Sequence, residues 1–205
     1  MSAPQYHGAI VAAGRESGWW IVGAAALAIA AMVAALLAVE GLGEIGVRAG
    51  IRWTARTSVV LFSIAFAASS ANALWRTRAT KWVLRNRRYI GVSFAVSHFT
   101  HLALIGALAS MDVDAFIAAR SVGGVAGGGL AYLFIAAMVI TSFDRTARWL
   151  GRRRWRILHT TGMYVICAVF AFNYAGLAVQ SPAYIAPVAL LTVAIALRVI
   201  ARLRN

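Results

Sequence analysis

The sequence predicts an all-α integral membrane protein, a bundle of six transmembrane helices in one domain. Of its 205 residues 61% are hydrophobic, and the mean hydropathy is +0.76. Six apolar stretches are long enough to cross a hydrocarbon core about 30 Å thick as helices. None of them shows the short alternating pattern of barrel strands. Because backbone N–H and C=O groups must be paired in lipid, we expect each stretch to be a helix.

The six predicted spans are residues 18–39, 53–75, 89–110, 125–143, 157–179 and 182–200. The first run is longer than the apolar region of a cleaved signal peptide, so we expect that helix to be retained. Residues 1–17 form a predicted cytoplasmic tail, 18–200 the membrane domain, and 201–205 a basic C-terminal tail. Pro182 follows a short turn, which predicts a tight hairpin between the last two spans. The glycine cluster at the start of the fourth span predicts an outer loop and a face where helices approach closely.

The basic residues lie in segments that the six spans place on one side. The chain has 20 Lys and Arg against 6 Asp and Glu, a formal net charge of +14. By the positive-inside rule the basic segments and both termini are cytoplasmic, in a bacterial-type inner membrane. The lipid bilayer, with anionic headgroups as counter-ions, is the expected partner, and nucleic acid is not. These residues are Arg76, Arg78, Lys81, Arg85, Arg87 and Arg88, then Arg145, Arg148, Arg152, Arg153, Arg154 and Arg156, then Arg198, Arg202 and Arg204.

Three histidines lie in the predicted spans, where an ionisable side chain is costly and usually binds something. His98 and His101 share one helix face, roughly 4.5 Å apart along the axis. At about 1.5 Å per residue from the basic segments, they lie roughly 15 and 20 Å deep, and His159 only about 5 Å. These imidazoles predict a haem iron site, with one haem if helix tilt brings His98 toward His159.

Two stacked haems would need a second histidine, 14 residues away, on both the third and the fifth span. Histidines 14 residues apart lie about 40° apart on a helix and can carry one haem each. Arg87 stands 14 residues before His101, and Asn173 stands 14 residues after His159. An iron held by the third span could instead take Met163 as its second ligand, because thioethers ligate haem.

Two regions of the chain contain recognisable motifs. The first comprises residues 87–91, Arg-Arg-Tyr-Ile-Gly, and 97–102, Ser-His-Phe-Thr-His-Leu, and the second comprises residues 141–144, Thr-Ser-Phe-Asp, and 148–159, which end in Ile-Leu-His. The first region resembles the start of the third helix, and the second the signature leading into helix five, of the ferric reductase-like transmembrane domain family. That family includes NADPH oxidases, ferric reductases and the haem-bearing membrane subunit of the periplasmic methionine sulfoxide reductase system. The resemblance covers about residues 50–195.

The resemblance implies a b-type haem between helices three and five and electron transfer across the membrane. By position it implies haem-ligand roles for His101 and His159, with His98 as a further candidate. Asn173 stands where the family has a second histidine on helix five, so the resemblance implies one haem. The family's oxidases carry a flavin and nicotinamide domain after helix six. Here we expect electrons from a quinol or a separate flavoprotein, and an acceptor on the outer, periplasmic side.

Three functions stay open on the sequence alone. The leading one is an electron-transfer oxidoreductase component with haem b, in which Arg56 and Arg87 hold the propionates or serve only as membrane-flanking anchors. The second is a haem-free assembly or docking subunit of a redox complex, suggested by the missing histidine. The third is a quinone or other small-molecule site lined by His98 and His101. No acidic residue lies within a predicted span, which argues against hydrolase chemistry and proton-coupled transport.

Overall fold

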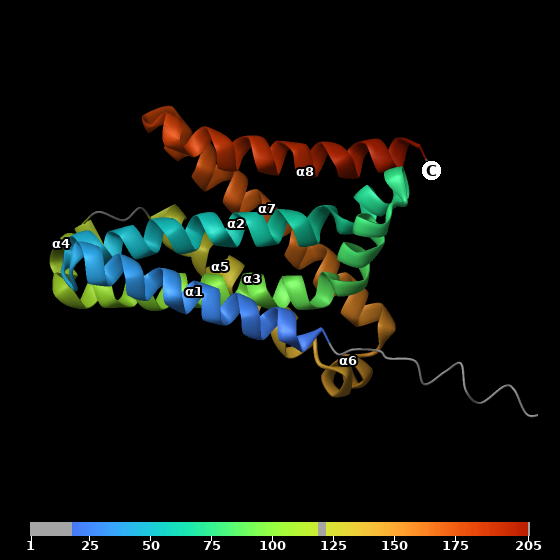
Figure 1. The fold of residues 1–205 in the computed structure, drawn as a ribbon, viewed down its shortest axis with the longest axis horizontal. Helices are drawn as coiled ribbons and strands as arrows, with labels where there is room; N and C mark the ends of the chain where they lie inside the picture. Colours follow the sequence, from blue (N-terminus) through green and yellow to red (C-terminus); the bar gives the residue numbers. More distant parts are fainter. Residues whose placement is uncertain (1–17, 119–121, 205) are drawn as a thin grey trace, which may run out of the picture.

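The computed structural model describes residues 18–118 and 122–204, and every regular element in these ranges is a helix (Figure 1). Six helices are long and apolar enough to cross a membrane. The predictions of an all-α fold and of six helices suited to a membrane are therefore confirmed for the described residues. The elements are α1 (Trp19–Glu40), α2 (Glu44–Trp75), α3 (Arg78–Met111), α4 (Val113–Ala118), α5 (Val122–Ile140), α6 (Asp144–Leu150), α7 (Arg152–Gln180), the short 3-10 helix η1 (Pro182–Tyr184) and α8 (Ile185–Leu203).

Three of the spans belong to longer helices than hydropathy predicts. α2 begins at Glu44, α3 at Arg78 and α7 at Arg152, before the predicted starts at residues 53, 89 and 157. The predicted basic loop between α2 and α3 is reduced to Arg76, which has a positive φ of 48°, and Thr77. The side chain of Thr77 accepts a hydrogen bond of 3.2 Å from the N–H of Thr80 and so caps α3. Hydropathy marks the part of a helix that suits lipid, whereas caps and turns mark where the helix begins.

The glycine cluster at residues 123–129 lies within a helix and not in a loop. Because α5 begins at Val122, the loop predicted at the start of this cluster is wrong. A Cβ at Gly123, Gly127, Gly128 or Gly129 would meet no described atom within 4 Å, so these four bring no other helix of this chain close. Close packing occurs instead at Gly162 of α7, where a Cβ would lie 3.1 Å from the ring of Phe134 on α5.

The hairpin predicted at Pro182 is confirmed. α7 ends at Gln180, and the hydroxyl of Ser181 accepts a hydrogen bond of 3.4 Å from the N–H of Ala183. Pro182 then opens η1, where its missing N–H is no loss. The structure also contains two short helices, α4 and α6, that no hydropathy signal predicted.

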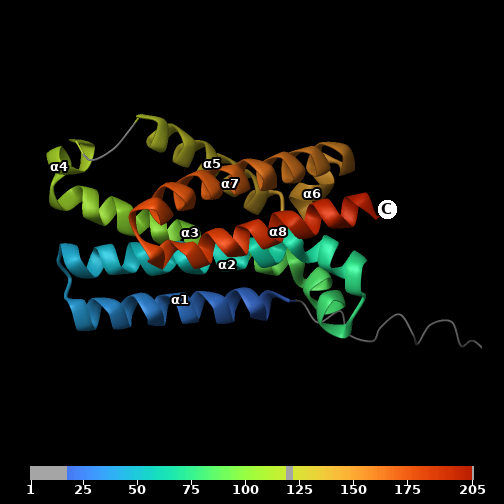
Figure 2. The same cartoon turned by 90° about the horizontal axis from the view of Figure 1, so that it is seen from above.

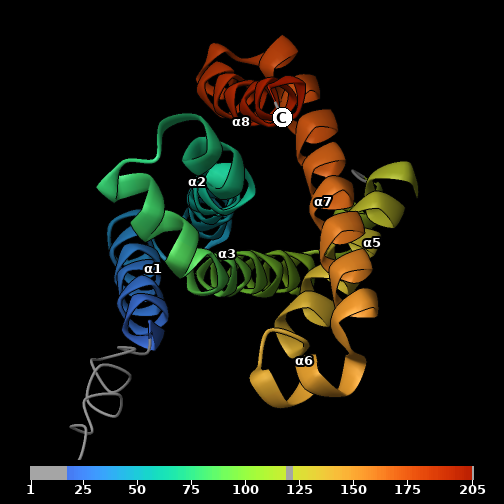
Figure 3. The same ribbon diagram turned by 90° about the vertical axis from the view of Figure 1, so that its right-hand side faces the viewer.

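The antiparallel helices α2 and α3 form the centre of the bundle. α1 packs against them on one side, α5 and α7 pair on the other, and α8 packs against α2 and α7 (Figures 2 and 3). α7 is tilted, so that it begins beside α6 and α5 and ends near the start of α8 (Figure 3). The ends of α2, α5 and α8 and the starts of α1, α3 and α7 lie together, at what we name the arginine-rich end (right-hand side of Figure 1).

An aromatic cluster joins the two halves of the bundle. The ring of Phe62 on α2 lies 5.5 Å from that of Phe94 on α3 and 5.4 Å from that of Phe170 on α7. Such ring pairs contribute about 0.5–1.5 kcal/mol each beyond the area they bury. The outer surface of the spans is apolar, for example at Leu27 and Leu133, as contact with lipid requires.

Candidate functional site

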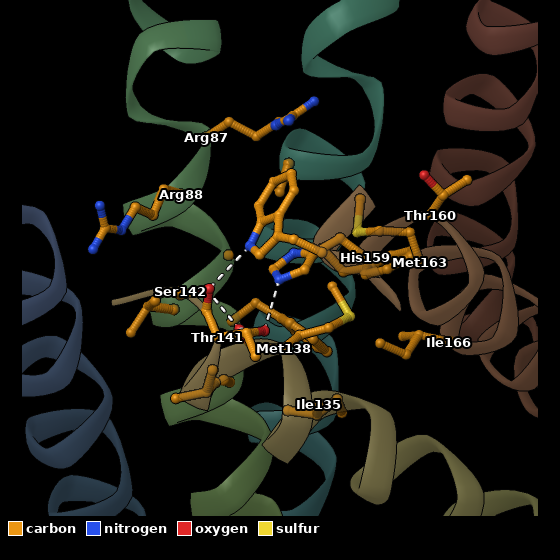
Figure 4. A pocket seen from close by; sticks show the side chains of 18 of the residues that line it. Arg87, Arg88, Ile135, Met138, Thr141, Ser142, His159, Thr160, Met163 and Ile166 are labelled. Carbon is orange, nitrogen blue, oxygen red and sulfur yellow. Dashed lines mark hydrogen bonds between the residues drawn. The ribbon is translucent and has the colours of Figure 1, made fainter. Parts of the chain in front are cut away.

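A cavity of about 540 Å³ lies at the arginine-rich end, lined mainly by α3, α5 and α7 (Figure 4). Its deeper part is apolar and includes Phe62, Phe94, Ile135 and Ile166. Pockets of roughly 300–1,000 Å³ hold most cofactor-sized ligands. The cavity is therefore large enough for a bound organic molecule.

One imidazole, that of His159, lines the cavity among the residues that the structure describes. Its Nε2 lies 3.0 Å from the hydroxyl of Thr141, in the turn after α5 (Figure 4). That hydroxyl has one proton, which it donates to the carbonyl oxygen of Ala137 at 2.7 Å. The oxygen then accepts the Nε2–H of His159, so we assign the proton of this imidazole to Nε2.

A tryptophan holds the same imidazole from a second direction. The ring of Trp155, one turn earlier on α7, stacks on His159 with centroids 4.1 Å apart and 24° between the planes. The indole N–H of Trp155 donates to the carbonyl oxygen of Thr141 at 2.9 Å. Two contacts thus connect the start of α7 to the end of α5 and fix the orientation of the imidazole.

Five guanidinium groups surround the cavity, against one carboxylate. Arg88 pairs with Asp144 at 2.7 Å. The other four, Arg85, Arg87, Arg156 and Arg198, form no ion pair with a described carboxylate. The lining therefore has an excess of positive charge that an anionic group could neutralise.

Neutral groups hold two of these arginines in place. Arg87 donates to the hydroxyl of Ser69 at 2.6 Å, and Arg198 donates to the carbonyl oxygen of Phe66 at 2.9 Å. The guanidinium of Arg198 also lies over the ring of Phe66, at 4.4 Å from its centroid. Such contacts orient both cations without neutralising them.

His98 and His101 lie together, as their spacing predicts, but outside the cavity lining. Their rings stack with centroids 5.3 Å apart and 16° between planes. His98 is 8% exposed, and its Nδ1 has no hydrogen-bond partner in the described part of the chain. His101 donates from Nδ1 to the carbonyl oxygen of Ile51 at 3.0 Å, an acceptor without a proton of its own.

Of the other predicted site residues, some line the cavity and one lies outside it. Met163 and Arg87 line the cavity with His159. Arg56 does not, and its guanidinium lies over the rings of Trp53 and Tyr184 at 5.1 and 5.7 Å. No group of three His, Cys, Asp or Glu residues that could hold a metal ion occurs in the ranges 18–118 and 122–204.

Sequence reasoning did not assign Thr141, Trp155 or Arg198 to a site. Thr141 was visible only as part of a family-like motif, and Arg198 only as one of the basic residues that set orientation. Their roles depend on which helix faces which, and spacing within one helix does not contain that information. Comparisons with protein-family models, with curated proteins and with solved structures found no match to this chain, so the resemblance to ferric reductase-like domains rests on the motifs alone.

Proposed function

We propose that this protein binds one b-type haem in the cavity at the arginine-rich end and relays electrons across a membrane. The observation that carries the proposal is the combination, in one cavity, of an imidazole, apolar walls and guanidinium groups without a carboxylate partner. A haem needs the same three features, because its iron takes an axial nitrogen, its macrocycle prefers a dry pocket and its propionates are anionic.

The residues present fit a haem in chemical type. His159 would supply the axial nitrogen, and Arg87 and Arg198 would hold the propionates. Phe62, Phe94 and the neighbouring apolar side chains would keep water from the macrocycle. A bound haem supplies reversible one-electron transfer, and the polarity of its pocket tunes the potential.

The predicted orientation gives the side of the membrane on which the cavity lies. If the arginine-rich end is cytoplasmic, the cavity lies on the cytoplasmic side of a bacterial-type inner membrane. The donor that we propose is a quinol or a separate flavoprotein, and the acceptor lies on the outer, periplasmic side, as the sequence resemblance implies. The motif resemblance to electron-transferring membrane domains supports this assignment.

An optical spectrum tests the proposal directly. We expect protein purified in detergent from haem-supplied cells to show a Soret band that shifts on reduction with dithionite. His159→Ala should lose the band, whereas Asn173→Ala, at an exposed position outside the cavity, should keep it. A colourless preparation from such cells contradicts the proposal, and a colourless protein that co-purifies with a stoichiometric partner favours the haem-free docking subunit.

A second candidate is a quinone or another small molecule in the same cavity. The observation that favours it is the hydrogen bond between His159 Nε2 and Thr141, since a ligand other than iron can leave that bond intact. Mass spectrometry of the molecules extracted from the purified protein separates the two. A quinone at equal molar ratio without a haem spectrum would support this second function.

A further inference from the structure

We infer that a haem in this cavity would have His159 as its only side-chain ligand, so that its iron would also accept a small exogenous ligand. This inference rests on the proposed function and deepens it. It also differs from the two-histidine ligation that the sequence resemblance implies. The class of ligand is a small σ-donor such as carbon monoxide, cyanide or free imidazole.

The first support is the composition of the cavity wall opposite α7. The wall formed by α3 contains no histidine, although α3 holds both His98 and His101. A Cβ at Gly91 would meet no described atom within 4 Å, so this part of the wall is open. The α3 residues in the lining are Leu84, Arg85, Arg87, Arg88, Gly91, Val92, Phe94 and Ala95.

The second support is an aromatic wall between the cavity and His98. Phe94 lines the cavity and also lies 5.5 Å from the ring of His98. Phe170 and Tyr132 pack on the same imidazole at 5.3 and 4.8 Å. His98 could reach the cavity only if these packed aromatic rings moved apart, and a closely packed interior resists such a rearrangement.

His101 contacts α2 and does not line the cavity. Its Nδ1 lies 3.0 Å from the carbonyl oxygen of Ile51, and the fully buried Thr54 hydroxyl lies 3.3 Å from the same nitrogen. It is also three residues further from the arginine-rich end than His98, about 4.5 Å along the helix. The imidazole thus serves as a link between α3 and α2.

The methionine sulfurs do not supply an opposite ligand. Met163 is four residues after His159 on the same helix, and residues at this spacing lie on one face. Two side chains on one face of one helix cannot approach an iron from opposite sides of a flat macrocycle. Met138 comes from α5, which also provides the turn that holds His159, and it packs against Gly162 of α7. Both sulfurs therefore lie on the α5 and α7 side.

Electron paramagnetic resonance and optical spectra of the haem-loaded protein test the inference. We expect a high-spin ferric haem, and a ferrous haem whose Soret band shifts when carbon monoxide is added. His159→Gly should lose the haem, and millimolar imidazole should restore it by occupying the vacated ligand position. His98→Gln and His101→Asn should keep the haem content and the high-spin signal of the parent.

The outcomes separate this inference from the proposed function. A low-spin ferric haem that becomes high-spin in His98→Gln or His101→Asn would overturn the single-imidazole site and leave the haem function standing. A protein without haem would overturn the function itself. His101→Asn keeps an N–H group that can donate to the carbonyl oxygen of Ile51, so we expect this variant to fold. Gel filtration and thermal unfolding check the folding of both variants.

Discussion

At the scale of single residues, the contact between Thr141 and His159 decides how readily the imidazole can bind a metal. The hydroxyl occupies Nε2, so an iron that binds there must displace it. We expect Thr141→Val, which keeps the shape but removes the hydroxyl, to raise haem affinity about fivefold, from a hydrogen bond worth about 1 kcal/mol. The haem-free variant should be less stable by a similar amount. Titration with haem, followed at the Soret band, and thermal unfolding measure the two effects.

Thr160→Val is the matched control for this experiment. Thr160 is the neighbour of His159 in the chain and lines the same cavity, but no hydrogen bond joins its hydroxyl to the imidazole. It should leave haem affinity and stability near the parent values. Equal affinities for Thr141→Val and the parent would show that the hydroxyl does not compete with iron.

The structure brings some of the predicted site residues together and keeps others apart. His159, Met163 and Arg87 lie in one cavity, and His98 and His101 lie side by side, as spacing predicts. Spacing could not show that Phe94 stands between these two sets, because the rotation of α3 relative to α7 depends on packing across the bundle. The ligand roles of all three histidines remain predictions.

At the scale of helices, hydropathy located every span but misjudged several ends. The ends depend on local devices, such as the cap at Thr77 and the positive φ of Arg76, that carry no hydropathy signal. Basic residues continue a helix out of the apolar region without breaking it, since arginine is a good helix former. The predicted loops were therefore too long.

Two glycines inside helices, Gly46 near the start of α2 and Gly106 in α3, offer a test of helix packing because their substitution should have opposite effects. A Cβ at Gly46 would collide with the backbone oxygen of Gly41, which cannot move without distorting the turn. We expect Gly46→Ala to destabilise the protein by about 1–3 kcal/mol, the usual cost of overpacking. Gly106, inside α3, has open space around a Cβ, so Gly106→Ala should stabilise by about 0.5–1 kcal/mol. Thermal unfolding in detergent measures both, and equal shifts in the same direction would contradict the packing.

At the scale of the whole molecule, charge is separated between the two ends of the bundle. The start of α1 and the end of α8 lie at the arginine-rich end, where the candidate cavity also lies (Figure 1). The opposite end contains Glu40, Glu44 and Asp112, and its only ion pair among the described residues joins Arg48 to Glu44 at 2.6 Å. The sequence predicted that the basic segments share one side, because an even number of spans returns the chain to it. It could not predict which helices would be neighbours.

This separation predicts how the protein would be oriented when it is inserted into a bacterial inner membrane. Arginine-rich segments are retained on the cytoplasmic side, so the arginine-rich end and the cavity should face the cytoplasm. We expect green fluorescent protein fused after residue 205 to be fluorescent, and alkaline phosphatase fused after residue 118, behind α4, to be active. Exchanging the two reporters is the control, since each should then be silent: the fluorescent protein does not fold when exported unfolded, and the phosphatase needs the disulfides of the periplasm. The reverse pattern would place the cavity on the periplasmic side, and the electron donor of the proposed function would then have to be periplasmic as well.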